Sequence, residues 1–191
     1  DLHATMLSAF HERGVRQPVL VGFSGGALHA LGLGLRRASG ARGIVALSGC
    51  AERSASEREE LRAFARHLRA GAQLQDLMPG RMLSPAWVER PDAVAEVKGW
   101  LAAAPAEVLA AELEASASMP NLLPLLRELQ VPLLARVGAL DVIHRPALSQ
   151  AMAKAASRGA AQVVPGVGHA LLLEDAEGTA AAIEVFLSEL P

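Results

Sequence analysis

The feature that most constrains this chain is a serine between glycines, at the junction of an apolar run and a helical run. Residues 19–23 read Val-Leu-Val-Gly-Phe, and Ser24 follows within the pattern Gly-x-Ser-x-Gly that Gly22 and Gly26 complete. The small and apolar residues 27–33 then suit a buried helix. A strand, a serine on a sharp turn and a helix together form a nucleophile elbow, in which small neighbours are needed because strand and helix nearly touch.

A serine hydroxyl is a weak nucleophile, so it needs an adjacent base that an acid in turn orients. In proteins with this elbow, the acid and then the histidine follow the serine in the chain. Asp141 follows an apolar run over 131–137, and His169 lies on a glycine-containing loop after the apolar run 161–165. These positions predict a catalytic triad in which Ser24 is the nucleophile, Asp141 the orienting acid and His169 the general base and then acid.

Two further observations concern this predicted site. Gly25 begins the helix after the serine, so its backbone N–H is predicted to donate to a developing oxyanion, supported by the helix dipole. Glu174 and Asp175 lie close to His169 and are rival acids. Their position at the start of the last predicted helix favours a role as helix N-terminal charges instead.

The sequence predicts locations for the remaining histidines but no catalytic role. His144 is three residues from Asp141 and is a candidate for the mouth of the substrate pocket, with a helix start as the alternative. His3 and His11 are expected to face solvent on an amphipathic helix, and His29 to pack as a core or interface residue. The spacing of His, Cys, Asp and Glu matches no metal site, so we predict neither a metal nor another cofactor.

The composition limits the kinds of molecule that the protein is expected to bind. The 191 residues are 51% hydrophobic and 20% charged, with a formal net charge of −2, which is typical of a globular domain and argues against nucleic acid as a partner. No apolar run approaches the length of a membrane span, and the chain begins at Asp1 without a signal-peptide pattern, so we expect a cytoplasmic protein that does not bind membranes. The single cysteine, Cys50, is expected to be a buried inert thiol, with the active-site rim as the alternative.

Strand and helix patterns alternate along most of the chain, which predicts an α/β fold with a parallel sheet and helices on both faces. The predicted strands lie near 19–23, 43–49, 132–137 and 161–165, and the predicted helices near 1–13, 25–39, 121–130, 145–158 and 175–190. Sites in such sheets lie at the carboxyl ends of the strands, where Ser24, Asp141 and His169 are expected.

Residues 51–118 lack the strand pattern and are predicted to form an all-helical cap inserted into a core of residues 1–50 and 119–191. The predicted cap helices cover 54–70, 72–78, 85–90, 91–103 and 105–118. Both tryptophans, Trp87 and Trp100, lie in this segment. They are candidates for lining the substrate pocket, with packing inside the cap as the alternative.

These residues resemble the α/β-hydrolase fold family over nearly the whole chain. The matching stretches are 22–26, 137–141, 165–169 and the lead-in 122–132. The middle of the chain resembles the 3-oxoadipate enol-lactonases and their carboxylesterase relatives, through 84–87 and 100–107. The resemblance implies a metal-independent hydrolase of esters or lactones. Relatives often carry His where this chain has Phe23, which implies an apolar subsite there.

The resemblance also implies that part of the fold is missing. Family members usually have eight strands with the elbow after the fifth, whereas here Ser24 follows a single predicted helix. The elbow strand would then have an unpaired edge, and the loop that supplies the second oxyanion donor would be absent. We therefore expect an N-terminal companion chain or fragment, with a homodimer as the alternative.

Two functions stay open from the sequence. The first is a serine hydrolase that cleaves a small ester or lactone through an acyl-enzyme. The second is a non-catalytic or incomplete hydrolase-fold module that acts as a binding or assembly half.

Overall fold

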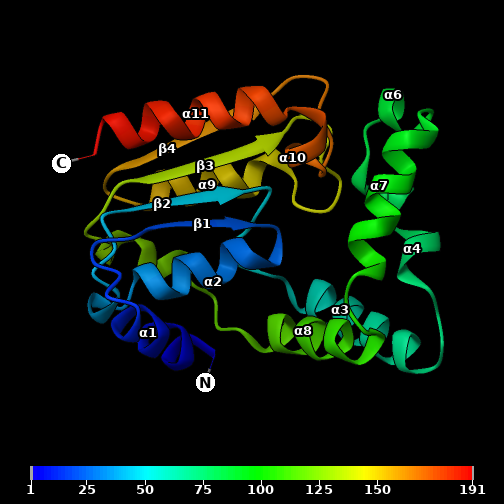
Figure 1. Cartoon of the computed structure of the whole chain (residues 1–191), viewed down its shortest axis with the longest axis horizontal. Helices are drawn as coiled ribbons and strands as arrows, with labels where there is room; N and C mark the ends of the chain where they lie inside the picture. The colour runs from blue at the N-terminus through cyan, green and yellow to red at the C-terminus, as the bar shows by residue number, and fades with distance from the viewer. Residues whose placement is uncertain (1, 191) are drawn as a thin grey trace.

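A computed structural model of the chain describes residues 2–190 and contains one four-stranded parallel sheet (Figure 1). The strands are β1 (Val19–Phe23), β2 (Gly43–Leu47), β3 (Leu133–Gly138) and β4 (Gly159–Val164). Each strand pairs with the next one along the chain, in the order β1-β2-β3-β4. The predicted α/β class is confirmed, and the strand bounds differ from the predicted ones by at most two residues.

Alternate residues of the strands supply two separate cores, one on each face of the sheet. Ile44 and Leu133 pack toward α2 (Gly25–Gly34) and α9 (Pro146–Ala155). Val45 and Leu134, their neighbours along the strands, pack on the opposite face against Phe186 of α11 (Ala176–Ser188). Both faces of β2 and β3 are therefore apolar, as expected for a parallel sheet covered by helices on both sides.

The predicted helices outside the middle segment differ from the observed ones in detail. α1 covers Leu2–Glu12. The helix predicted over 25–39 ends at Gly34, because Arg36 has an extended backbone, and a separate 3₁₀ turn, Arg37–Ser39, follows. The segment predicted as a helix over 121–130 is the 3₁₀ helix Leu123–Glu128, and the last helix is preceded by the short α10 (Leu171–Glu174).

The segment between β2 and β3 is helical, as predicted. Its helices are α3 (Ala55–Arg69), α4 (Leu74–Leu77), α5 (Pro79–Met82), α6 (Pro85–Val88), α7 (Pro91–Ala102) and α8 (Ala106–Ser118). A proline begins each of α5, α6 and α7, where its missing N–H costs no helical hydrogen bond. The helix predicted over 72–78 is shorter, because Met78 is the boundary between α4 and α5. Figure 1 shows the segment beyond the carboxyl ends of the strands, with α3 and α8 side by side.

The strand that precedes Ser24 lies at an edge of the sheet. Within the part of the chain that the structure describes, β1 pairs with β2 alone. Val21, at the middle of β1, is 51% exposed although its neighbours Leu20 and Gly22 are buried. An apolar strand with an open edge is a template for pairing with another strand. Among residues 2–190, no helix combines the length and apolar character required to cross a bilayer.

Candidate active site

The turn after β1 holds Ser24 in a strained backbone conformation. Its φ of 53° and ψ of −118° lie in a region that residues other than glycine rarely adopt. The turn is tight because β1 and α2 nearly touch: a Cβ added to Gly22 would lie 2.2 Å from the carbonyl oxygen of Gly26. The Ser24 N–H donates to the carbonyl of Leu47, at 2.9 Å, and so fixes the turn to the end of β2.

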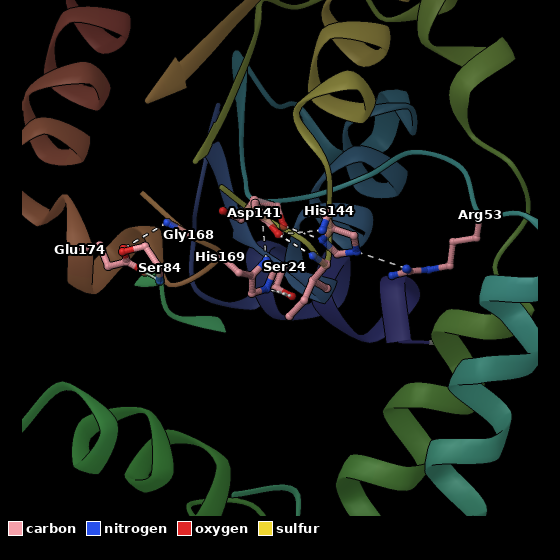
Figure 2. A network of polar contacts seen from close by, with 10 residues as sticks. Ser24, Arg53, Ser84, Asp141, His144, Gly168, His169 and Glu174 are labelled. Carbon is pink, nitrogen blue, oxygen red and sulfur yellow. Dashed lines mark hydrogen bonds and ion pairs between the residues drawn. The ribbon is translucent and has the colours of Figure 1, made fainter. Parts of the chain in front are cut away.

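The structure brings the three predicted triad residues together (Figure 2). His169 Nε2 lies 2.9 Å from Ser24 Oγ, and His169 Nδ1 lies 2.8 Å from Asp141 Oδ2. The side chains of His169 and Asp141 are almost fully buried. A carboxylate accepts hydrogen bonds, so Nδ1 carries the ring proton and the lone pair of Nε2 faces the serine hydroxyl. This is the tautomer that a general base for Ser24 requires.

The other carboxylate oxygen of Asp141 fixes the orientation of the group. Its Oδ1 accepts hydrogen bonds from the backbone N–H groups of Ile143, at 2.9 Å, and His144, at 2.8 Å. The loop that bears the acid and the loop that bears His169 also pack closely, since a Cβ on Gly138 would lie 2.2 Å from the carbonyl oxygen of Val167. Backbone contacts thus fix the positions of the Asp141 carboxylate and the His169 imidazole relative to each other.

Glu174 has a different role from the one predicted. It is the last residue of α10 and not the first of the last helix. Its carboxylate accepts from the N–H of Gly168, at 3.1 Å, and from the N–H of Ser84, at 3.0 Å, which joins the His169 loop to the helical segment (Figure 2). Asp175 precedes α11, as predicted, and forms an ion pair with Arg136 of β3.

A cavity of about 510 Å³ opens beside Ser24 and His169. Phe23 and Trp100 both line it, and the Phe23 ring centroid is 5.3 Å from that of His169. Gly25, at the start of α2, also lines the cavity. Trp87 does not line this cavity, so of its two predicted roles the pocket role is wrong and packing within the helical segment is the one observed: its ring packs in the cluster of α5 and α7 and is covered by the guanidinium of Arg90, 4.1 Å away.

His144 lies at the cavity, as predicted, but is buried and hydrogen-bonded at both ring nitrogens. Nδ1 is 2.6 Å from the carbonyl oxygen of Ser48, and Nε2 is 3.2 Å from Nη1 of Arg53. The carbonyl only accepts and the guanidinium only donates, so His144 is a neutral ring with its proton on Nδ1. Burial, reinforced by the neighbouring His169, lowers the pKa of His144 to about 4.

This lowered pKa predicts a loss of stability in mild acid. Between about pH 6.5 and pH 4 the unfolded chain binds a proton at His144 that the folded chain does not bind. Stability is therefore fully retained above pH 6.5 and falls as pH is lowered toward 4, by roughly 3 kcal/mol from this group. Urea unfolding at a series of pH values measures the loss.

His144→Asn supplies the comparison, because an amide can still donate to Ser48 but does not titrate. We expect its stability to vary less with pH over this range. The control His67→Asn removes an exposed histidine of α3 and should leave the wild-type pH dependence unchanged. Parallel curves for wild type and His144→Asn would contradict the assignment.

One prediction for the other histidines is wrong. His3 is buried rather than facing solvent, and its Nε2 lies 3.2 Å from Nδ1 of His29, whose Nε2 lies 3.0 Å from Glu112 Oε1. Burial, with His29 nearby, lowers the pKa of His3. His29 is partly buried at the interface between α2 and α8, as predicted, and His11 is exposed.

Cys50 is buried, as predicted, and burial raises the pKa of its thiol, which keeps it unreactive. Within residues 2–190, no three His, Cys, Asp or Glu side chains are arranged to hold a metal ion. Arg53 and Glu112 also lie near the site and were not predicted from the sequence, and Glu174 was predicted near His169 but not as the link to Ser84. The positions of Arg53 and Glu112 depend on how the loop before α3 and the helix α8 pack, and neither residue belongs to a motif that could have identified it.

The parallel sheet, the strained serine turn and the order of Ser24, Asp141 and His169 define a protein of the α/β-hydrolase class. A model of the alpha/beta hydrolase family matches residues 1–182. The chain belongs to the alpha/beta hydrolase family and is a hydrolase enzyme.

Solved structures share this fold at low sequence identity. An esterase from Thermogutta terrifontis, solved with malate bound, has a TM-score of 0.89 at 24% identity, covering 96% of this chain and 70% of its own. The enol-lactonase from Burkholderia xenovorans LB400 has a TM-score of 0.88 at 22% identity, with 98% and 72% covered. MenH from S. aureus has a TM-score of 0.82 at 19% identity, with 98% and 74% covered. No curated protein matches the chain significantly in sequence.

Proposed function

We propose that the protein is a serine hydrolase that cleaves a small ester or lactone through an acyl-enzyme. The observation that carries this proposal is the hydrogen-bonded chain from Ser24 Oγ through His169 to Asp141, which lies beside a cavity large enough for a small substrate. The residues act as nucleophile, base and orienting acid, in that order.

In the first half of the reaction, Ser24 Oγ attacks the carbonyl carbon while its proton passes to His169 Nε2. Asp141 stabilises the imidazolium that forms. The carbonyl oxygen becomes an oxyanion, for which the Gly25 N–H is the proposed donor, because the first N–H groups of α2 have no acceptor within the helix. His169 then gives its proton to the leaving oxygen, and the ester bond breaks.

In the second half, water attacks the acyl-enzyme. His169 Nε2 takes a proton from the water, and the resulting tetrahedral intermediate collapses to release the acid. The proton returns to Ser24 Oγ, which restores the starting state. No metal is required for any of these steps.

The same proposal assigns the helical segment a role in substrate choice. We propose that residues 51–118 act as a cap on a core of residues 1–50 and 119–191. Phe23 and Trp100 give the cavity apolar walls, which suits the uncharged parts of a small ester or lactone. The esterase and enol-lactonase among the structural neighbours are consistent with this substrate class.

Labelling with a fluorophosphonate tests the proposal. We expect one label per chain, attached at Ser24 and located by peptide mass spectrometry, together with hydrolysis of 4-nitrophenyl acetate. Ser24→Ala should lose both. Ser8→Ala, which removes an exposed hydroxyl on α1, should keep both. A folded wild-type protein that neither reacts nor hydrolyses the ester would support the alternative, a binding or assembly module.

We also propose that a further strand covers the open edge of β1 in the functional protein, supplied by an N-terminal companion chain or fragment. The exposure of Val21 on an edge strand supports this, since such an edge beside Ser24 invites pairing. Sedimentation and intact-mass measurement of the purified protein should find this chain with a second, different polypeptide. A homodimer would replace the companion with a second copy, and a stable monomer of 19.9 kDa would overturn the proposal.

A further inference from the structure

His144 lies between the loop that carries the acid and the end of the strand beside the nucleophile. Its residue is 4% exposed, and its ring meets the ring of His169 edge-on, with the centroids 5.4 Å apart. Both of its ring nitrogens are hydrogen-bonded within the protein, so the reaction at Ser24 makes no use of its side chain as an acid or a base. A buried, fully bonded imidazole against the catalytic base is placed to hold the site together.

On the acid side, His144 acts through its backbone. Its N–H donates to Oδ1 of Asp141 at 2.8 Å, and this is one of the two hydrogen bonds that orient the carboxylate. The ring and this N–H belong to the same residue, three positions after Asp141. A contact that holds the ring therefore also limits where the carboxylate can lie.

On the nucleophile side, the ring of His144 is bonded to the segment that follows β2. Nδ1 donates to the carbonyl oxygen of Ser48 at 2.6 Å. The carbonyl of the preceding residue, Leu47, accepts the N–H of Ser24 at 2.9 Å. Two consecutive carbonyl groups at the end of β2 thus hold the serine turn and the acid loop, one each.

Ser48 is held in place by its backbone. Its φ of 45° lies in the left-handed region, which serine rarely adopts, and the residue is fully buried. Its N–H donates to the carbonyl of Arg136 in β3 at 2.8 Å, whereas its hydroxyl has no hydrogen-bond partner among the described residues. A strained residue persists where its surroundings fix it, and here the bond from His144 is one of the two backbone contacts that do so.

The other ring nitrogen of His144 faces the helical segment. Nε2 accepts from Nη1 of Arg53 at 3.2 Å, which is longer than the contact with Ser48, and Arg53 also donates to Ser116 Oγ at 3.0 Å (Figure 2). A guanidinium only donates, so this contact keeps the ring proton on Nδ1. Arg53 thereby selects the tautomer that the bond to Ser48 needs.

We propose that His144 is a positioning residue for the triad. By its bond to Ser48, the ring fixes the distance between the nucleophile and the acid. This inference rests on the proposed function. His169 spans that distance with one ring, at 2.9 Å from Ser24 Oγ and 2.8 Å from Asp141 Oδ2, so both bonds form only at the right separation. A misplacement of about 1 Å costs about 100-fold in rate.

Two amide variants separate the two ring contacts. The amide nitrogen of asparagine is as many bonds from Cβ as Nδ1 is, so His144→Asn keeps a donor to Ser48 and loses the contact with Arg53. The amide of glutamine reaches the position of Nε2, so His144→Gln keeps an acceptor for Arg53 and loses the bond to Ser48. With 4-nitrophenyl acetate, we expect kcat within a few fold of wild type for His144→Asn. For His144→Gln we expect kcat to be about 10- to 100-fold lower, with a much smaller change in KM.

The comparison excludes a role in stability alone, because each amide variant loses one hydrogen bond of the ring and such a role predicts equal kcat values. Equal values, or the reverse order, would overturn the inference. His144→Phe keeps a ring against His169 but loses both hydrogen bonds, and it should match His144→Gln. The control His67→Phe replaces an exposed histidine of α3 and should keep the wild-type kcat.

NMR of the protein with nitrogen-15-labelled histidine tests the geometry without a substrate. In wild type we expect the Nδ1 protons of His144 and His169 to be protected from exchange with water. The His169 proton should stay protected in His144→Asn and exchange faster in His144→Gln. A freely exchanging His144 proton in wild type would overturn the inference, and this measurement decides it should a variant not fold. An enzyme that hydrolyses no ester disproves the proposed function, while the His144 signal still reports the contact with Ser48.

Discussion

Replacing Asp141 by asparagine should lower kcat for ester hydrolysis by about 10⁴-fold, with little change in fold. We expect this loss because two hydrogen bonds at Oδ1 fix which way the asparagine amide is oriented. The N–H groups of Ile143 and His144 both donate to this oxygen, so the amide oxygen of asparagine must stay there. The amide NH₂ then faces Nδ1 of His169 and donates to it. The ring proton moves to Nε2, which can no longer accept the proton of Ser24.

Steady-state kinetics with 4-nitrophenyl acetate measure this effect, and unfolding in urea checks the fold. The matched control is Asp175→Asn, which removes a carboxylate from an ion pair with Arg136, away from the cavity. We expect it to affect stability but to change kcat by only a few fold. An Asp141→Asn enzyme with near wild-type kcat would show that the carboxylate does not set the tautomer of His169.

Replacing Gly22 by alanine should destabilise the protein by about 4 kcal/mol or more, or prevent folding. The added Cβ would lie 2.2 Å from the carbonyl oxygen and 2.4 Å from the carbonyl carbon of Gly26, and 2.6 Å from the backbone nitrogen of Ala27. All three are backbone atoms, so no side-chain rotation relieves the overlap. Relief requires moving β1 away from α2, which also displaces Ser24.

The control for this substitution is Gly99→Ala in α7. No heavy atom lies within 4 Å of a Cβ added there, and the site is exposed in the middle of a helix. Alanine should therefore stabilise the protein by about 1 kcal/mol through helix propensity. Urea unfolding of both variants gives the comparison. A Gly22→Ala protein as stable as wild type would mean that strand and helix are not in contact at the serine turn.

The strands were predicted well from the sequence, because each one is a short and mostly apolar run. β1 and β2 are short apolar runs followed by glycine or serine, and both strands begin where predicted. Ser24, Asp141 and His169 each follow a strand, so the common direction of the strands was enough to place them at one edge. Their hydrogen-bonding distances depend in addition on the loop contacts of Asp141 and Gly168.

The residues around the triad could not be predicted in the same way, because their positions depend on packing between distant segments. Trp87 and Trp100 were equal candidates in the sequence, yet only the second turns toward the cavity. Arg53 lies just before a run of charged residues that reads as an exposed helix, and its contact with His144 spans 91 positions of the chain. The burial of His3 likewise depends on how α1 rests against α2.

The carboxylate of Glu174 joins two parts of the molecule that are far apart in the sequence. Its two oxygens accept from Gly168, next to the catalytic imidazole, and from Ser84, in the helical segment. The N–H of Ala170 donates in addition to the carbonyl of Met82, at 2.8 Å. Any outward swing of residues 82–84 that admits substrate or releases product must therefore strain or break the anchors of the loop that carries His169. The position of the catalytic imidazole is therefore tied by hydrogen bonds to the position of residues 82–84 of the helical segment.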